Sequence, residues 1–145
     1  MGCDIHIVLE RRKKGRDKWI GVYSTDEAYP IIRKNMIAAR RDYAFFGEVA
    51  AVRSRPETGS PLYPRNLPED MSDLTREQYW RAPRDYHSAS YATPAEFAER
   101  WLKANTEKPE HFRQKDVRPD HALYDLLGID SDSDADYRVV FWFDN

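Results

Sequence analysis

Residues 2–10 read GCDIHIVLE, and this stretch decides how the chain folds. Side chains alternate between the two faces of an extended strand, so one face here is apolar and the other is mixed. The other face places a carboxylate and an imidazole two residues apart, at Asp4 and His6. We predict a core strand whose mixed face floors a polar pocket, meets solvent or is closed by a satisfied polar pair. The apolar face consists of Cys3, Ile5, Ile7 and Leu9.

Two further segments complete the predicted sheet. RRKKGRDK (11–18) is a polar turn around Gly15, and WIGVY (19–23) is the expected antiparallel partner of the first strand. Residues 137–144 alternate in the same way, which predicts a third strand. If this strand lies beside the first, its Trp142 and Asp144 line the same floor as His6.

Capping signals predict the helices. In TPAEF, Thr93 caps, Pro94 takes the first helical position and Glu96 completes a capping box. Asp42 can cap another helix, over 42–53. Two shorter helical segments are expected, one capped at Thr75 with Gln78 and one over 120–127.

These elements together predict an α+β fold. We expect an antiparallel sheet of at least three strands, with three or four helices packed on one side of it. Residues 54–72 contain four prolines and no regular pattern, so this long loop is expected to be an ordered lid or wall. At 145 residues, the chain is expected to form a single domain over 1–145.

Composition and charge limit the classes of protein to which this chain can belong. One cysteine excludes an internal disulfide framework, and no apolar run is long enough to cross a membrane, so a cytoplasmic protein is expected. The net charge is −2, although residues 1–55 carry 12 Lys/Arg against 7 Asp/Glu. This local excess favours an anionic ligand but is too small for a surface that binds duplex nucleic acid.

The segment DYHSAS (85–90) lies between two prolines, and we expect a loop there. Its His87, Ser88 and Ser90 could bind a ligand or turn their own backbone. Adjacent Ser and His residues are no catalytic dyad, because such partners meet in space, and no nucleophile elbow is present.

Arginines and aromatic residues form a further group of candidates. Arg41, Arg53 and Arg65 lie at helix ends or in the proline-rich loop, and arginine is suited to a bidentate grip on phosphate. Arg40, Arg55 and Arg84 belong to the same group, and the aromatic residues that could stack on a base are Tyr43, Tyr63, Tyr86 and Trp142. Ordinary surface solvation is the structural alternative for each arginine.

Metal-binding motifs are missing from the sequence. Alternating aspartates over 130–136 resemble a calcium loop, but the glycine at position six and the glutamate at position twelve are absent. We therefore predict no metal site and no cofactor, and a divalent metal enters only under the enzyme alternative below.

Several blocks of sequence resemble a family of small proteins encoded by tailed bacteriophages and prophages. The family pattern prefers glycine where this chain has Asn66, and its later loop tends to read His-Ser-x-Ser, as here from His87. Most members have no assigned function, so the resemblance implies an accessory role in the cytoplasm of the infected host without naming a reaction. The blocks are MGCDIH, RDYAFFGEVAAVR, PRNLPEDMS, DYHSAS and VVFWFDN.

Three functions are compatible with these residues. The first is an anti-defence binding module that sequesters a small anionic, nucleotide-like ligand in a polar pocket. The second is a hydrolase or phosphodiesterase acting on a nucleotide, with metal binding or acid–base work shared among four residues. The third is an inhibitor that binds a host enzyme. The four residues of the enzyme alternative are Asp4, His6, Asp85 and His87.

The binding module requires residues from separate segments to converge on one cavity. A homo-oligomer also stays open, because sites on small sheet domains often lie at subunit interfaces. The expected ligand contacts are Asp4, His6, Arg41, Tyr43, Arg53, Arg65, His87, Ser88, Ser90 and Trp142.

Overall fold

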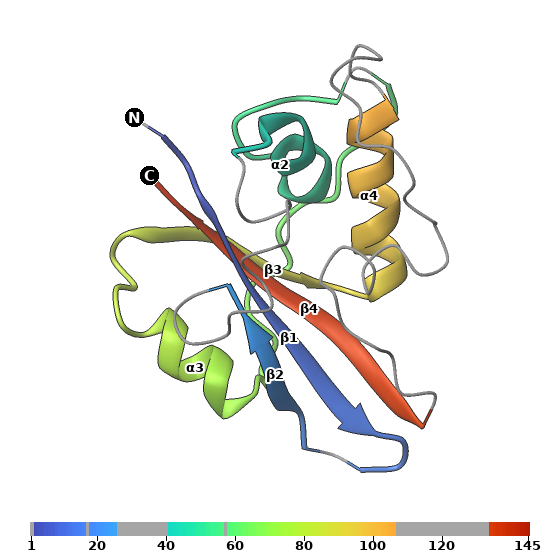
Figure 1. Ribbon diagram of the computed structural model, residues 1–145. Coiled ribbons are helices and arrows are strands. Elements are labelled where there is room, and N and C mark those ends of the chain that lie inside the picture. Colours follow the sequence, from blue (N-terminus) through green and yellow to red (C-terminus); the bar gives the residue numbers. More distant parts are fainter. Residues whose placement is uncertain (1, 17, 26–40, 57, 107–133) are drawn as a thin grey trace.

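The computed structural model describes residues 2–16, 18–25, 41–56, 58–106 and 134–145. Within them, four strands form an antiparallel sheet in the order β2–β1–β4–β3, and three helices pack on it (Figure 1). The predicted α+β fold is therefore confirmed, whereas the helix expected over 120–127 lies outside the described residues. The elements are β1 (Ile5–Lys13), β2 (Ile20–Ser24), α2 (Tyr43–Ala50), α3 (Asp73–Tyr79), β3 (Tyr86–Ala92), α4 (Pro94–Thr106) and β4 (Ala135–Asp144).

Strands β1 and β4 form the centre of the sheet. They pair antiparallel from Ile5 opposite Phe143 to Lys13 opposite Ala135, without a register shift. Figure 1 shows the N and C ends of the chain side by side at one end of this pair. β2 flanks β1 and β3 flanks β4, so the two central strands are hydrogen-bonded on both sides.

Helices α2 and α4 cover one face of the sheet. Their aromatic side chains pack on the apolar stripe of the two central strands, and Phe45 and Phe97 meet edge to face with ring centroids 5.1 Å apart. The alternation predicted for the first and last strands is confirmed. The fully buried members of this core include Leu9, Phe45, Phe46, Val49, Phe97, Val139, Phe141 and Phe143.

The opposite face is covered by α3 and the segment that precedes it. Val8, Val140 and Trp142 are fully buried there, packed against Leu74 of α3 and other partly buried side chains. We expected the helices on one side only, and this prediction was wrong, because the second face of the central strands is also apolar and has to be covered. Gly21 permits the close packing of α3 on β2, since a Cβ there would lie 2.5 Å from Leu74 Cβ.

The segment DYHSAS is part of an edge strand, and the loop predicted there was wrong. β3 pairs with β4 from Tyr86 to Ala92, with an irregularity between His87 and Ser90 where Ser88 has a φ of 55°. One extra residue in β3 accounts for the shift, as in a β-bulge. Pairing with an apolar central strand thus overrides the weak strand propensity of these polar residues.

The helix caps follow the sequence signals with one change. Asp42 accepts a hydrogen bond from Phe45 N, and Thr93 and Glu96 cap one another reciprocally at 3.0 and 3.1 Å. α3 begins one turn earlier than predicted, because Ser72 caps it in place of Thr75. No helix in the described part of the chain is long and apolar enough to cross a bilayer.

A buried carboxylate fastens α3 to the sheet. Glu10 has no exposed surface, and its Oε2 accepts hydrogen bonds from Ser72 N at 2.6 Å and Thr75 Oγ1 at 2.7 Å. Its Oε1 lies 2.6 Å from Arg138 Nε, and Arg138 Nη1 continues to Asp70 Oδ1 at 2.7 Å. Both oxygens of the carboxylate are therefore satisfied, as burial of a charge requires.

Replacement of Glu10 by alanine should lower the free energy of unfolding by about 3–5 kcal/mol, because it leaves the Arg138 guanidinium buried beside a single carboxylate. Urea denaturation followed by circular dichroism measures the change. The control is Arg76→Ala, which removes an exposed pair with Asp73 and should cost no more than about 0.5 kcal/mol. Equal losses in the two variants would contradict the central role of this carboxylate.

Candidate functional site

Most of the predicted site residues gather where β1 begins and β4 ends. We call this group the sheet-end cluster. Its contacts run between the start of β1, the residues around α2, the start of β3 and the end of β4. The cluster comprises Asp4, His6, Arg41, Tyr43, Arg53, His87, Ser88, Asp144 and Asn145.

The opening aspartate and histidine each have a separate partner. Arg41 grips Asp4 at two points, with Nε–Oδ1 at 2.8 Å and Nη2–Oδ2 at 3.2 Å, and this guanidinium lowers the pKa of the Asp4 carboxyl. His6 Nε2 lies 2.6 Å from Asp144 Oδ2, and its ring is stacked on Trp142. A carboxylate that orients an imidazole is an arrangement suited to proton transfer.

The remaining cluster residues lie on the other face of the sheet. His87 stacks on Phe143, and its Nε2 is 3.2 Å from Asn145 Oδ1, which also accepts a hydrogen bond from Arg53 Nη2 at 3.3 Å. His87 Nδ1 is 3.0 Å from the hydroxyl of Ser88. His87 therefore faces the α2–α4 core, whereas His6 faces the α3 side.

Two smaller findings bear on chemistry at this cluster. Asp85 lies in the turn before β3, and the two histidines of the enzyme alternative lie on opposite faces of the sheet, His6 against Trp142 and His87 against Phe143. Burial raises the pKa of the Cys3 thiol, and the nearby Arg53 partly offsets this rise. No group of three or more His, Cys, Asp or Glu side chains among the described residues is arranged to hold a metal ion.

Three predicted ligand contacts are placed elsewhere. Arg65 pairs with Glu96 at 2.6 Å and donates to the carbonyl of Tyr91, and its backbone N donates to Ser90 Oγ. These contacts tie the proline-rich loop to the edge strand and to the start of α4. Trp142 has no exposed surface, so its ring packs in the core on the α3 face.

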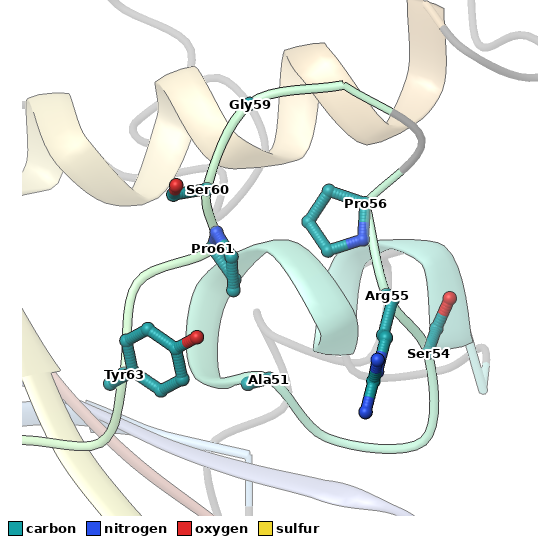
Figure 2. Close-up of a pocket in the computed structure, with 8 residues that line it drawn as sticks. All are labelled: Ala51, Ser54, Arg55, Pro56, Gly59, Ser60, Pro61 and Tyr63. Atoms are coloured by element: carbon teal, nitrogen blue, oxygen red, sulfur yellow. The ribbon is translucent and has the colours of Figure 1, made fainter.

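A pocket of about 580 Å³ lies between the end of α2 and the proline-rich loop (Figure 2). We call it the loop pocket. The described residues of 54–72 form no helix or strand, and several residues of the first half of this segment line the pocket. The lining residues are Ala51, Ser54, Arg55, Pro56, Gly59, Ser60, Pro61 and Tyr63.

The pocket begins with an abrupt end to α2. Ala51 has a left-handed φ of 54° and donates to the carbonyl of Gly47, which ends the helix with the hydrogen bond of an αL motif. Val52 N also donates to Phe46 O. Arg53 is also left-handed, with a φ of 63°. Non-glycine residues held in this conformation are costly, and such strain is frequent near functional sites.

The loop is held against α4 by a second buried carboxylate. Glu48 of α2 is fully buried and lies 3.2 Å from Arg100 Nη1 and 2.8 Å from Lys103 Nζ. Arg100 also donates to the carbonyl of Ser60 at 2.7 Å, and Lys103 donates to that of Thr58. The pocket wall is therefore fixed in place without regular secondary structure.

Arg55 and Tyr63 are the side chains that give the loop pocket its chemistry. Figure 2 shows them on opposite sides of the pocket, with Ala51 between them and the two prolines above. Tyr63 is 68% exposed, and within the described residues no carboxylate pairs with Arg55. The sequence offered Arg55 and Tyr63 among the arginine and aromatic candidates, but neither was among the expected ligand contacts. A glutamate inside the apolar AFFGEVA segment is a signal that the neighbouring chain is anchored there.

Gly47→Ala should displace the pocket wall. A Cβ at this position would lie 2.7 Å from the carbonyl oxygen of Ser54, and backbone cannot move aside as a flexible side chain does. We expect a loss of about 1–3 kcal/mol in unfolding free energy, measured by urea denaturation, together with altered NMR shifts over 51–63. Ala44→Gly, elsewhere in α2, is the control and should leave those shifts unchanged.

Glu96 should titrate far below an ordinary glutamate. The hydrogen bonds from Arg65 lower its pKa from 4.5 to about 2, so its stabilising effect is complete above pH 4.5 and is lost as the pH falls towards 2. Carboxyl-carbon NMR titration measures this pKa, and Arg65→Met should raise it. A wild-type Glu96 that titrates near 4.5 would show that Arg65 does not hold the loop to α4.

The structure thus offers a sheet-end cluster, whose charges are paired with one another, and a loop pocket lined by the exposed Arg55. No family model, curated protein or solved structure matches this chain.

Proposed function

We propose that the protein binds and sequesters a small anionic, nucleotide-like ligand in the loop pocket. The observation that carries this proposal is a pocket of about 580 Å³ with Arg55 on one side and the exposed ring of Tyr63 on the other. Pockets for small molecules usually enclose roughly 300–1,000 Å³. The volume is thus sufficient for a nucleotide-sized molecule.

The two side chains match the two parts of a nucleotide. Tyr63 offers a flat face on which a base can stack, an interaction that contributes roughly 1–3 kcal/mol per base. Arg55 can donate two parallel hydrogen bonds to a phosphate group. Ser54 and Ser60 add small polar groups to the lining.

A fixed wall favours tight binding. Ordering a flexible loop costs free energy at the moment of binding, and a loop that is already ordered avoids that cost. Here Glu48, Arg100 and Lys103 hold the wall through carbonyl contacts before any ligand arrives. This supports a module that captures its ligand, in keeping with the accessory role that the phage resemblance implies.

A hydrolase is the second candidate, and it is favoured by one contact. His6 lies 2.6 Å from Asp144, and a carboxylate-bound imidazole can act as a general acid or base. Its sheet-end location is separate from the loop pocket, so the two candidates predict different sensitive residues.

The test has two parts. Small molecules released by denaturing the protein from defence-active cells are identified by mass spectrometry, and thermal unfolding is measured with a panel of nucleoside monophosphates, cyclic nucleotides and dinucleotides. A ligand at 100 times its dissociation constant should add about 2.7 kcal/mol. Arg55→Ala should weaken binding about 10- to 100-fold, since it removes a charged hydrogen-bond donor. Tyr63→Ala should weaken it similarly, and Tyr63→Phe should retain the stacking.

Arg84→Ala is the matched control, because it removes an exposed arginine outside the pocket. An intact ligand that depends on Arg55 supports sequestration. A cleaved ligand whose release depends on His6 supports the hydrolase. If Arg55→Ala binds every panel member as wild type does, the pocket assignment is wrong.

A further inference from the structure

We propose that the tip of the β1–β2 hairpin is a sequence-independent contact surface for the phosphodiester backbone of nucleic acid. We define the hairpin tip as residues 11–16 and 18, which contain six lysines or arginines. In the sequence RRKKGRDK one aspartate, at position 17, lies among them and outside the described residues. Short runs rich in Lys and Arg are typical of nucleic-acid patches. This surface is separate from the loop pocket and does not depend on the ligand proposed there.

Most cations of the tip are exposed and lack carboxylate partners. Arg11, Lys13, Lys14 and Arg16 are all exposed, and no carboxylate of the described residues pairs with them. The pairs that do form are long: Arg12 with Asp136 at 3.6 Å, and the highly exposed Lys18 with Asp73 at 3.7 Å. Such surface pairs are weak and are screened by salt.

The backbone holds these cations in one place. Arg16 N donates to the carbonyl of Lys13 at 3.0 Å, and Gly15 takes the left-handed φ of 77° that the turn requires. Lys14 N donates to the carbonyl of Asp134 at 3.1 Å, which joins the tip to the start of β4. The charges therefore sit on a closed hairpin and not on a loose tail.

The base of the tip is also firm. The indole ring of Trp19 is buried and contacts two guanidinium groups, with the carbon of Arg12 4.5 Å and that of Arg138 4.1 Å from its centroid. Cation–π contacts of this kind favour one orientation of each arginine. Figure 1 shows the hairpin projecting beyond the helices, at the opposite end of the sheet from the chain ends.

The shape and surroundings of the tip favour nucleic acid over a membrane surface. A two-stranded ribbon fits the major groove of a duplex, and a single strand can follow the same row of charges. A membrane contact is usually reinforced by exposed apolar side chains. Of the exposed large apolar residues described, Ile20 alone flanks the hairpin, since Tyr63 and Trp80 belong to other elements.

The net charge of the whole chain does not decide whether the hairpin tip can bind nucleic acid. The net charge of −2 led us to expect no binding to duplex nucleic acid, but phosphate contacts depend on the local surface. The described acidic residues that contact the tip are Asp73, which pairs with Lys18, and two at the start of β4, Asp134 and Asp136. Replacing Asp134 and Asp136 with asparagine should strengthen binding, because these carboxylates repel a phosphate backbone.

Fluorescence anisotropy with the full chain tests the proposal. The probes are a labelled mixed-sequence 20-mer as single-stranded DNA and the same sequence as duplex, titrated between 25 and 200 mM salt. If the four unpaired cations each neutralise one phosphate, the slope of log K against log salt should be about −3 for the single strand and about −4 for the duplex. The probe with the higher affinity identifies the preferred form.

Charge reversal at Lys13, Lys14 and Arg16 to glutamate should weaken binding at least tenfold at low salt and reduce the single-strand slope to about −1. The matched control reverses Arg76, Arg81 and Arg84, which changes the net charge equally but lies on and after α3. Thermal unfolding verifies the fold, and the glutamine version of the hairpin variant replaces the glutamate version if that one unfolds. Arg55→Ala should bind the probes as wild type does.

Three results would overturn the proposal. The first is no salt-dependent binding of either probe, and the second is an equal loss in the control. The third is binding to vesicles of phosphatidylserine and phosphatidylcholine without binding to the oligonucleotides, which would make the tip a membrane contact.

Discussion

The structure depends on the pairing of β1 with β4. The two strands lie at the centre of the sheet, with an apolar stripe on one face and the buried residues Val8, Val140 and Trp142 on the other, so both faces have to be covered. Helices α2 and α4 close one face, and α3 with its preceding segment closes the other. The two layers that cover the faces of the sheet are thus consequences of one strand pair.

Two buried carboxylates then fix the irregular parts of the chain. Glu10 lies on the mixed face of β1 and holds the start of α3, while Glu48 lies in α2 and holds the wall of the loop pocket. Burying a charge costs free energy, and a buried ion pair is often no more stabilising than apolar packing. What both glutamates supply is a defined position for segments rich in proline, where backbone hydrogen bonding is sparse.

Sequence patterns were most informative where one local rule was sufficient. The alternation in GCDIHIVLE and the capping box from Thr93 to Glu96 each predicted the element that forms. β3 escaped prediction because its strand conformation depends on pairing with β4 across a bulge. The face covered by α3 escaped for the same reason, since it is decided by the tertiary fold.

For the site residues too, local patterns identified the residues, whereas their partners depend on the tertiary fold. The sequence identified the polar residues at the sheet end, but their partners could not be read from it: Asp4 meets Arg41, and His6 meets Asp144. Arg65 is the type of residue expected to contact an anionic ligand, yet its guanidinium forms an ion pair with Glu96. The loop pocket was beyond prediction, because it depends on the left-handed backbone at Ala51 and on the close approach of Ser54 to Gly47.

The central pairing also constrains how the protein is made. Glu10 and its partner Arg138 are 128 positions apart, so a nascent chain emerging from the ribosome carries β1 without its central neighbour β4 throughout most of translation. Contacts this distant slow folding, because a large loop must close before they form. A chaperone bound to β1 during synthesis would shield its apolar residues until β4 has been made. Premature termination would leave a fragment without the β1–β4 pair.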